Sequence, residues 1–159
     1  VLARFNLGET QYSDQAHLRL FSQAIEFFIM RPIAGIGWAN YEARTGVLHA
    51  HNIYITILAE TGIIGLALWL LLSGSVFLHG VRAVRISQRA DVGNASPPNS
   101  FLRYWNLGLL AAFVSVLVNN LFQVSAFFGF AWLLAGLIIA SHFVSVSESE
   151  GTSKVGMGS

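Results

Sequence analysis

Residues 104–147 contain no Asp, Glu, Lys or Arg, and this run constrains the fold more than any other feature. As a single helix it would be about 66 Å long, against a hydrocarbon core of about 30 Å in a typical bilayer. The polar residues Asn119, Asn120 and Gln123 interrupt the run near its middle. The run therefore predicts a hairpin of two transmembrane helices within residues 105–143.

A second apolar segment, residues 51–78, is long enough for a third span. Charged residues make up only 11% of the chain, whereas a soluble domain has about 25%. These features predict an all-α integral membrane protein with about three transmembrane helices. Residues 1–20 contain no apolar core of a signal peptide, so we interpret the chain as the C-terminal part of a larger multi-span bundle.

The charge and the cysteine content exclude several classes of function. The net charge of +1 provides no strong field that would attract nucleic acid, so no nucleic-acid partner is expected. The chain has no Cys, which excludes disulfides, thiolate nucleophiles and Cys-ligated metals.

The segment between the first span and the hairpin, residues 79–104, determines the predicted orientation. Its charged residues are Arg82, Arg85, Arg89 and Arg103, opposed by Asp91. Arg-rich segments next to membrane helices remain in the cytoplasm, so we expect this segment to be a cytoplasmic loop. Residues 1–50 then form a periplasmic loop. The tail, residues 144–159, lies in the cytoplasm, and its Ser, Gly and Glu content predicts disorder.

The periplasmic loop is expected to contain an amphipathic helix near residues 16–31, ended by Pro32. Its apolar residues fall at helical spacing on one face: Leu18, Phe21, Ile25, Phe28 and Ile29. Arg19, Gln23 and Glu26 fall on the other face, as in a helix lying in the membrane interface. On periodicity alone, Arg19 is an exposed charge that pairs with Gln23 or Glu26.

Two short motifs follow this helix. Gly35-x-Gly37 could form a phosphate-binding loop, but it lacks a preceding strand and a third glycine, so a tight turn that lets the backbone approach its neighbours is favoured. His49-Ala50-His51 could share a metal ion, but no third ligand stands nearby, and no metal or other cofactor is expected. Asn52 is the predicted N-cap of the helix that follows.

Within that helix, Asn52, Thr56 and Glu60 form a polar stripe that enters the membrane. An ionisable side chain about 12 Å below the helix end is costly unless it has a partner. Glu60 therefore either makes a structural hydrogen bond to a neighbouring helix or acts directly in function. Gly62 and Gly65 have the spacing of helix-packing glycines.

Taken together, these motifs resemble the signature of the O-antigen ligase and polymerase superfamily. The residues that carry the resemblance lie between about 17 and 72: Arg19, Pro32-x-x-Gly35-x-Gly37, His51-Asn52-x-Tyr54 and Leu58-Ala59-Glu60-x-Gly62-x-x-Gly65. The chain departs from the family pattern in lacking a Trp a few residues after the loop arginine.

The resemblance implies a multi-pass enzyme of the bacterial inner membrane, in lipopolysaccharide or polysaccharide biosynthesis, with its site facing the periplasm. Such enzymes transfer a glycan from an undecaprenyl-diphosphate carrier to lipid A–core or another acceptor, without metal or nucleotide. The loop arginine and the histidine of the family motif match Arg19 and His51, which are the predicted catalytic residues. Asn52, Glu60 and Arg44 are predicted to bind substrate.

The residue types suit this chemistry. An arginine fork can neutralise a diphosphate leaving group, and a histidine can take the proton of an acceptor hydroxyl near neutral pH. A polysaccharide polymerase is the alternative enzyme. A transporter-like subunit is a weaker alternative, because the residues after Glu60 turn apolar and offer no polar path. A non-catalytic membrane subunit would not need both Arg19 and His51.

Overall fold

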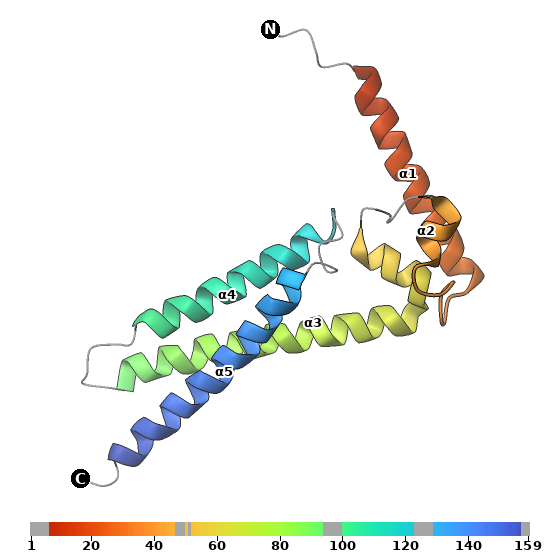
Figure 1. The fold of residues 1–159 in the computed structure, drawn as a ribbon. Coiled ribbons are helices and arrows are strands. Elements are labelled where there is room, and N and C mark those ends of the chain that lie inside the picture. The colour runs from red at the N-terminus through yellow and green to blue at the C-terminus, as the bar shows by residue number, and fades with distance from the viewer. Residues whose placement is uncertain (1–6, 47–49, 51, 94–99, 123–128, 157–159) are drawn as a thin grey trace, which may run out of the picture. The chain divides into compact units, whose positions relative to one another are not determined.

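The computed structural model describes residues 7–46, 50, 52–93, 100–122 and 129–156 (Figure 1). The described residues form five helices joined by turns and loops, and they contain no β-strand. The helices are α1 (Leu7–Met30), α2 (Asn40–Thr45), α3 (Ile53–Gly93), α4 (Ser100–Asn119) and α5 (Gly129–Gly156).

The all-α membrane architecture predicted from the sequence is confirmed. Three helical segments are long and apolar enough to cross a membrane: Ile53–Arg89, Phe101–Asn119 and Gly129–Ser149. The helix α4 ends at Asn119, the first of the polar residues from which the turn was predicted. The chain forms two compact units. One contains α1, α2 and α3 up to Trp69, and the other contains the rest of α3, α4 up to Val118 and all of α5.

In the first unit, α1 packs on its neighbours through Ala24, and not through the apolar stripe that was predicted to face the membrane interface. Ala24 is 1% exposed and packs with Tyr41, Ala50 and Ala59, and the ring of Phe27 covers this cluster. The predicted apolar stripe remains more open, with Leu18 at 69% and Ile29 at 68% exposed. The small side chain of Ala24 lets α1 approach Tyr41, Ala50 and Ala59 closely. The stripe of larger apolar residues remains available to lipid.

The start and end of α1 were predicted with different success. The helix ends at Met30, two residues before Pro32, as expected from the missing amide of proline. It begins at Leu7, well before the predicted residue 16. Residues 7–15 contain neither Pro nor a run of β-branched residues that would stop a helix, although their polar composition hid the helical periodicity.

The helix α3 contains a break at Gly62, where φ is 67° and ψ is −165°. Figure 1 shows α3 changing direction close to its N-terminal end. We expected Gly62 to be a helix-packing glycine in a continuous span, and this was wrong. Its positive φ lies in a region that glycine alone adopts at little cost, so Gly62 divides the predicted 51–78 span into a short first segment and a long second one.

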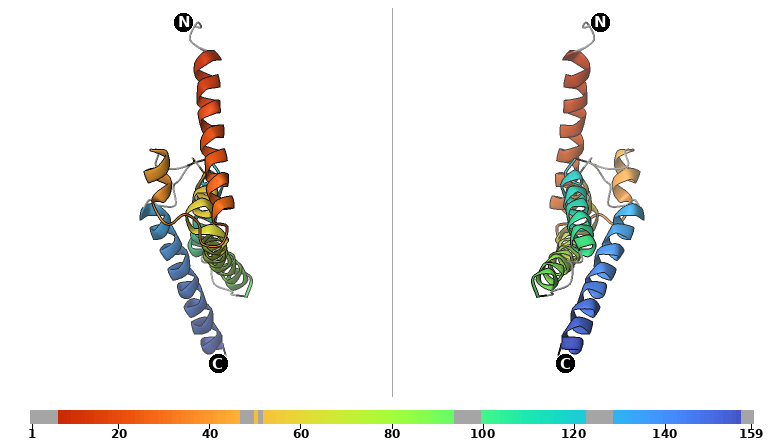
Figure 2. Two further views of the ribbon diagram at one scale, coloured as in Figure 1. Left: turned by 90° about the vertical axis from the view of Figure 1, so that its right-hand side faces the viewer. Right: turned by 90° about the vertical axis from the view of Figure 1, so that its left-hand side faces the viewer.

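In the second unit, α4 and α5 lie along the long part of α3 (Figure 2). Val76, Phe113 and Ile138, one from each helix, form the apolar centre of this unit. Gly80 lies at a contact between the three helices, because a Cβ there would press against Leu110 of α4 and Ile138 of α5.

A buried polar network joins the same three helices. Asn106 of α4 is 2% exposed, and its Nδ2 donates to Ser87 Oγ of α3 at 3.3 Å and to Ser145 Oγ of α5 at 3.1 Å. Its Oδ1 accepts from the hydroxyl of Ser141. Each polar atom finds a partner, so the network can fix the register of the three helices in an apolar medium.

Two predicted irregular segments are helical in the structure. In the segment 79–104, α3 continues to Gly93 and α4 begins at Ser100, so a loop can lie only between these ends. The tail was predicted to be disordered from residue 144, but α5 continues to Gly156. For the first segment, the arginines indicate where a helix leaves the membrane, but not where the helix ends. For the tail, the hydroxyls of Ser145 and Ser149 donate to preceding carbonyls of α5, so these serines are compatible with a helix.

Candidate functional site

The segment between α1 and α2 takes over the hydrogen bonds that α3 loses at its break. In a continuous helix, the carbonyls of Ala59 and Glu60 would accept from the amides four residues later. Here they accept from the loop instead, from Ile36 N at 3.0 Å and from Gly37 N at 2.9 Å.

The exchange is reciprocal. The amides released by the break, Ile63 N and Ile64 N, donate to the carbonyls of Pro32 at 2.9 Å and Ile33 at 3.4 Å. Four backbone groups that the break would leave without a hydrogen bond are therefore bonded to one short loop. This is the condition under which a broken helix is tolerated at membrane depth.

Two glycines make this contact possible. A Cβ at Gly35 would collide with the backbone of Glu60 and Thr61, and a Cβ at Gly62 would collide with the backbone of Ile33 and Ala34. Both glycines also have positive φ, at 68° and 67°. The tight turn expected at Gly35-x-Gly37 is confirmed, and its purpose is to seat the loop against the broken helix.

Glu60 lies at this junction and is 5% exposed. Its Oε1 accepts a hydrogen bond from the backbone amide of Tyr41, the second residue of α2, at 3.1 Å. The structure therefore gives the carboxylate the structural hydrogen bond that was one of the two readings of Glu60. It also shows that the partner is a backbone amide in α2, and not another transmembrane helix.

Tyr41 was not singled out in the sequence, but it is the central residue of this unit. It is 0% exposed, its hydroxyl donates to Leu20 O at 2.8 Å, and its ring meets Phe27 edge-on. Burial raises the pKa of the Tyr41 phenol to about 12. Through its two donors Tyr41 ties α2 to α1 and to α3. The one available signal was a tyrosine shortly after a glycine-rich turn.

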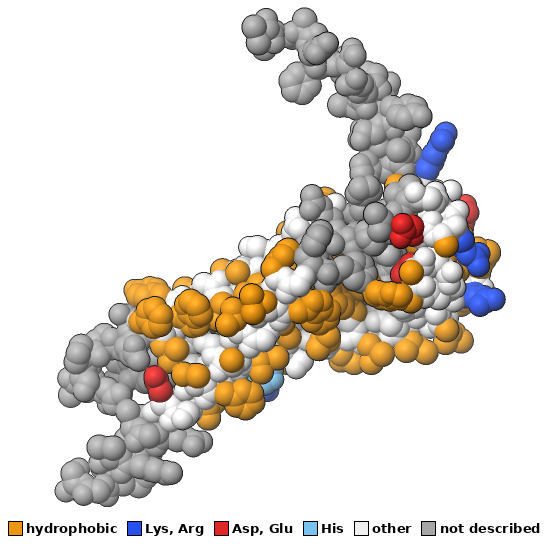
Figure 3. Space-filling model, viewed as in Figure 1, with side chains coloured by type: hydrophobic (Ala, Val, Ile, Leu, Met, Phe, Trp, Pro, Cys, Tyr) orange, Lys and Arg blue, Asp and Glu red, His pale blue; other side chains and the backbone are white. Residues whose placement is uncertain are grey.

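The predicted cationic residues are on the surface of the same unit. Arg19 is exposed on α1, directly before Leu20, whose carbonyl binds Tyr41. Arg44 is exposed on α2, with its guanidinium 5.6 Å from the centroid of the Phe27 ring. Figure 3 shows basic side chains standing out from the surface around α1 and α2. The two arginines therefore lie on α1 and α2, the two helices that contact each other through Phe27 and Tyr41.

The N-cap predicted at Asn52 is confirmed. Asn52 Oδ1 accepts from Ile55 N at 3.1 Å, and Asn52 Nδ2 donates to Leu121 O at 3.0 Å, just after α4. Thr56, 1% exposed, donates its hydroxyl to Asn52 O and accepts from Ala50 N. The residues on both sides of position 51 are thus attached to the first turn of α3.

His51 itself lies outside the described residues, as does His49. Among the described residues, no three His, Cys, Asp or Glu side chains come together as a metal site would require. Of the five predicted site residues, the structure describes Arg19, Arg44, Asn52 and Glu60. Two of these are exposed cations, and the other two hold backbone groups in place.

The comparison with known families supports the resemblance. Residues 2–70 match the family model described as O-Antigen ligase. The match includes every predicted site residue as well as the loop and the break that the loop stabilises. No curated protein and no solved structure matches the chain. This part of the chain is therefore similar to O-antigen ligases.

Proposed function

We propose that this chain carries the acceptor-activating part of a metal-independent glycan ligase of the bacterial inner membrane. The enzyme transfers a glycan from an undecaprenyl-diphosphate carrier to lipid A–core or another acceptor at the periplasmic face. The observation that carries the proposal is that the family match, residues 2–70, coincides with a unit that presents two exposed arginines on helices fixed to the first segment of α3.

The proposed reaction needs a cationic group for the leaving diphosphate. The acceptor oxygen attacks the anomeric carbon, the bond from that carbon to the diphosphate oxygen breaks, and the carrier diphosphate leaves with the electron pair. Arg19 and Arg44 stabilise the negative charge that develops, since a guanidinium binds phosphate oxygens through two parallel hydrogen bonds. Both side chains are exposed, so no rearrangement of the core is needed before they bind.

The reaction also needs a base for the proton of the acceptor hydroxyl. We assign this role to His51, because an imidazole can accept a proton near neutral pH. Its sequence neighbours, Ala50 and Asn52, are hydrogen-bonded to the first turn of α3. Asn52 is proposed to help bind substrate beside it.

Glu60 was predicted to bind substrate, and its surroundings suit an indirect role better. A carboxylate that is 5% exposed and bonded to an amide of α2 holds the α2 helix, and thereby Arg44, against α3. We therefore propose Glu60 as a positioning residue for the diphosphate-binding surface.

The proposal is tested by transfer from a purified lipid-linked donor to lipid A–core, with chelator present, by the full-length protein that contains these residues. Arg19→Lys should lose at least about tenfold in rate, because an ammonium cannot reproduce the planar fork of arginine. The matched control is Arg103→Lys on α4, which is exposed and lies outside the proposed site. Near wild-type transfer by Arg19→Lys, or equal losses in both variants, would contradict the assignment.

The same assay separates the ligase from the polymerase. A ligase transfers the glycan to lipid A–core and produces one product of defined size. A polymerase instead lengthens the lipid-linked glycan when no lipid A–core is added. A series of lengthening products from the donor alone would show that the enzyme is a polymerase and not a ligase. The roles proposed for Arg19 and His51 would stay the same.

A further inference from the structure

Three basic side chains converge in the second unit, far along the sequence from the proposed transfer site. His79 of α3 and His142 of α5 join through their Nδ1 atoms at 2.9 Å, with ring centroids 4.8 Å apart. Arg82 follows His79 by three residues on α3, so the two side chains lie on the same side of this helix. The structure gives Arg82 no acidic partner among the described residues.

The pair formed by His79 and His142 retains one ring N–H that is not used in the hydrogen bond between them. In a neutral pair joined through Nδ1, the ring that accepts the shared hydrogen bond carries its own proton on Nε2. One ring N–H is therefore always left for another partner, and a further proton on the pair would supply a second. Together with the guanidinium of Arg82, these donors form a group that an anion with several oxygens would satisfy.

The surroundings of the cluster are apolar and exposed. Leu78 of α3 is 52% exposed, Leu71 on the same face is 70% exposed, and Phe143, beside His142, is 62% exposed. Figure 3 shows a histidine beside a basic side chain on a surface that is otherwise largely apolar. A soluble anion would gain nothing from such neighbours, whereas the acyl chains of a lipid would cover them.

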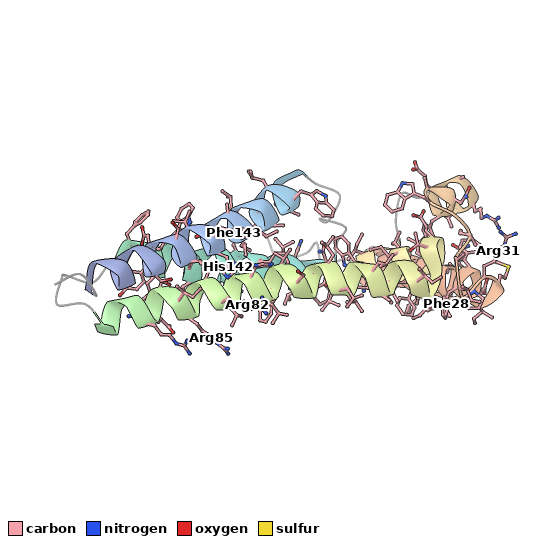
Figure 4. All side chains as sticks on the ribbon, turned by 90° about the horizontal axis from the view of Figure 1, so that it is seen from below. Phe28, Arg31, Arg82, Arg85, His142 and Phe143 are labelled. Carbon is pink, nitrogen blue, oxygen red and sulfur yellow. The ribbon has the colours of Figure 1, made fainter. Side chains whose placement is uncertain are left out.

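The register of α3 indicates which part of a lipid meets which residues. After the apolar stretch that ends at Leu78, exposed arginines follow at i, i+3 and i+7, namely Arg82, Arg85 and Arg89. Figure 4 shows Arg82 and Arg85 of α3 along the same stretch as His142 and Phe143 of α5. Arginines placed directly after a lipid-facing stripe reach the phosphates of the headgroup layer.

We propose that His79, Arg82 and His142 form a binding site for the phosphate of an anionic phospholipid, with Arg85 as a second contact. The phosphate oxygens accept from Arg82 and from the free ring N–H of the histidine pair. The acyl chains lie against Leu71, Leu78 and Phe143. The site is independent of the proposed transferase activity, because it belongs to the other unit and shares no residue with the transfer site.

The test is native mass spectrometry of the full-length protein in detergent, titrated with phosphatidylglycerol or with phosphatidylcholine of the same acyl chains. The wild type should bind at least one phosphatidylglycerol about fivefold or more tightly than phosphatidylcholine. Arg82→Gln should reduce that affinity about fivefold, the effect of one basic residue near a membrane surface. Arg103→Gln, an exposed arginine of α4 in the same unit, is the matched control and should leave it unchanged.

A second variant tests the histidine pair. His142→Phe keeps a ring of similar size but removes both nitrogens, so it should weaken phosphatidylglycerol binding and leave phosphatidylcholine binding unchanged. Equal binding of the two lipids, or equal losses in Arg82→Gln and Arg103→Gln, would overturn the site. Full displacement of phosphatidylglycerol by millimolar inorganic phosphate would show a soluble-anion site instead, and unchanged binding in His142→Phe would remove the pair from it.

Discussion

The backbone amide of Tyr41 donates to Oε1 of Glu60 at 3.1 Å, across 19 positions of sequence. This bond attaches α2 to the last turn of α3 before its break. Glu60 also contributes its carbonyl to the loop, through Gly37 N. One residue therefore binds both segments that precede α3, the loop by its main chain and α2 by its side chain.

The first prediction concerns the Glu60 carboxylate. Glu60→Ala should destabilise the protein by about 1–3 kcal/mol, because the buried amide of Tyr41 would lose its acceptor. Glu60→Gln retains Oε1 and should stay close to wild-type stability. Thermal unfolding in detergent measures both, with the exposed Glu42→Ala of α2 as control, expected within about 0.5 kcal/mol of wild type.

Activity of the same variants distinguishes positioning from direct contact with substrate. If Glu60 only holds α2, Glu60→Gln should retain most of the transfer activity. A Gln variant that is fully stable and yet inactive would show that the negative charge of Glu60 acts on the substrate.

The second prediction concerns the glycines at the break of α3. Gly62→Ala should cost about 2 kcal/mol or more, because the new Cβ combines a positive φ with a collision against the backbone of Ile33. Gly74→Ala, later in α3, is the control, since its Cβ would meet nothing within 4 Å. That change should be neutral or stabilising by up to about 1 kcal/mol. Equal stability of the two variants would refute the hydrogen-bond exchange described at the break.

The third prediction concerns alkaline pH. The pKa of Tyr41 is raised to about 12 by burial, whereas an unfolded tyrosine titrates near pH 10. Below about pH 10 the phenol is neutral in both states, and its contribution to stability is complete. Between about pH 10 and 12 the unfolded state loses its proton first, so the free energy of unfolding should fall by up to about 1.4 kcal/mol per pH unit.

Tyr41→Phe provides the reference for this measurement, because it removes the titrating group and keeps the ring. The difference in unfolding free energy between wild type and Tyr41→Phe should be constant from pH 7 to 9 and shrink above pH 10. A difference that does not change with pH would show that Tyr41 is not buried as the structure has it.

The sequence predicted the membrane class and the place where α4 ends, because both depend on local composition. A long uncharged run must form helices in a bilayer, and polar residues near its middle must mark the turn. Asn52 was predictable for the same reason, since an N-cap depends on residues within one turn. The end of α1 before Pro32 is a local effect as well.

The break at Gly62 could not be predicted from local sequence. Its stability depends on carbonyls and amides of the loop at residues 32–37, which pair with α3 only after the chain has folded. In the sequence, a glycine that packs against another helix cannot be distinguished from a glycine that breaks the helix in which it lies. The packing of Ala24 and the role of Tyr41 were missed for the same reason, because both depend on contacts with segments distant in sequence.

The fourth prediction concerns orientation, which rests on the arginines between residues 79 and 104 and stays a prediction. Single cysteines at Gln11 and Ser96, in a chain that has none of its own, can be tested with a membrane-impermeant thiol reagent. In intact spheroplasts, the cysteine at position 11 should react and that at position 96 should not. The reverse pattern would place the proposed transfer site in the cytoplasm and exclude the mechanism.

The central claim is that His51 takes the proton of the acceptor hydroxyl, and its most direct test is transfer from a lipid-linked donor by His51→Ala and His49→Ala, with chelator present. We predict that His51→Ala loses roughly 10²–10⁴-fold in rate while His49→Ala loses far less. Wild-type transfer should decline at acidic pH, because a protonated imidazole can no longer accept the proton of the acceptor. Equal losses in the two variants, or loss of wild-type activity on chelation alone, would contradict the claim and indicate a metal site.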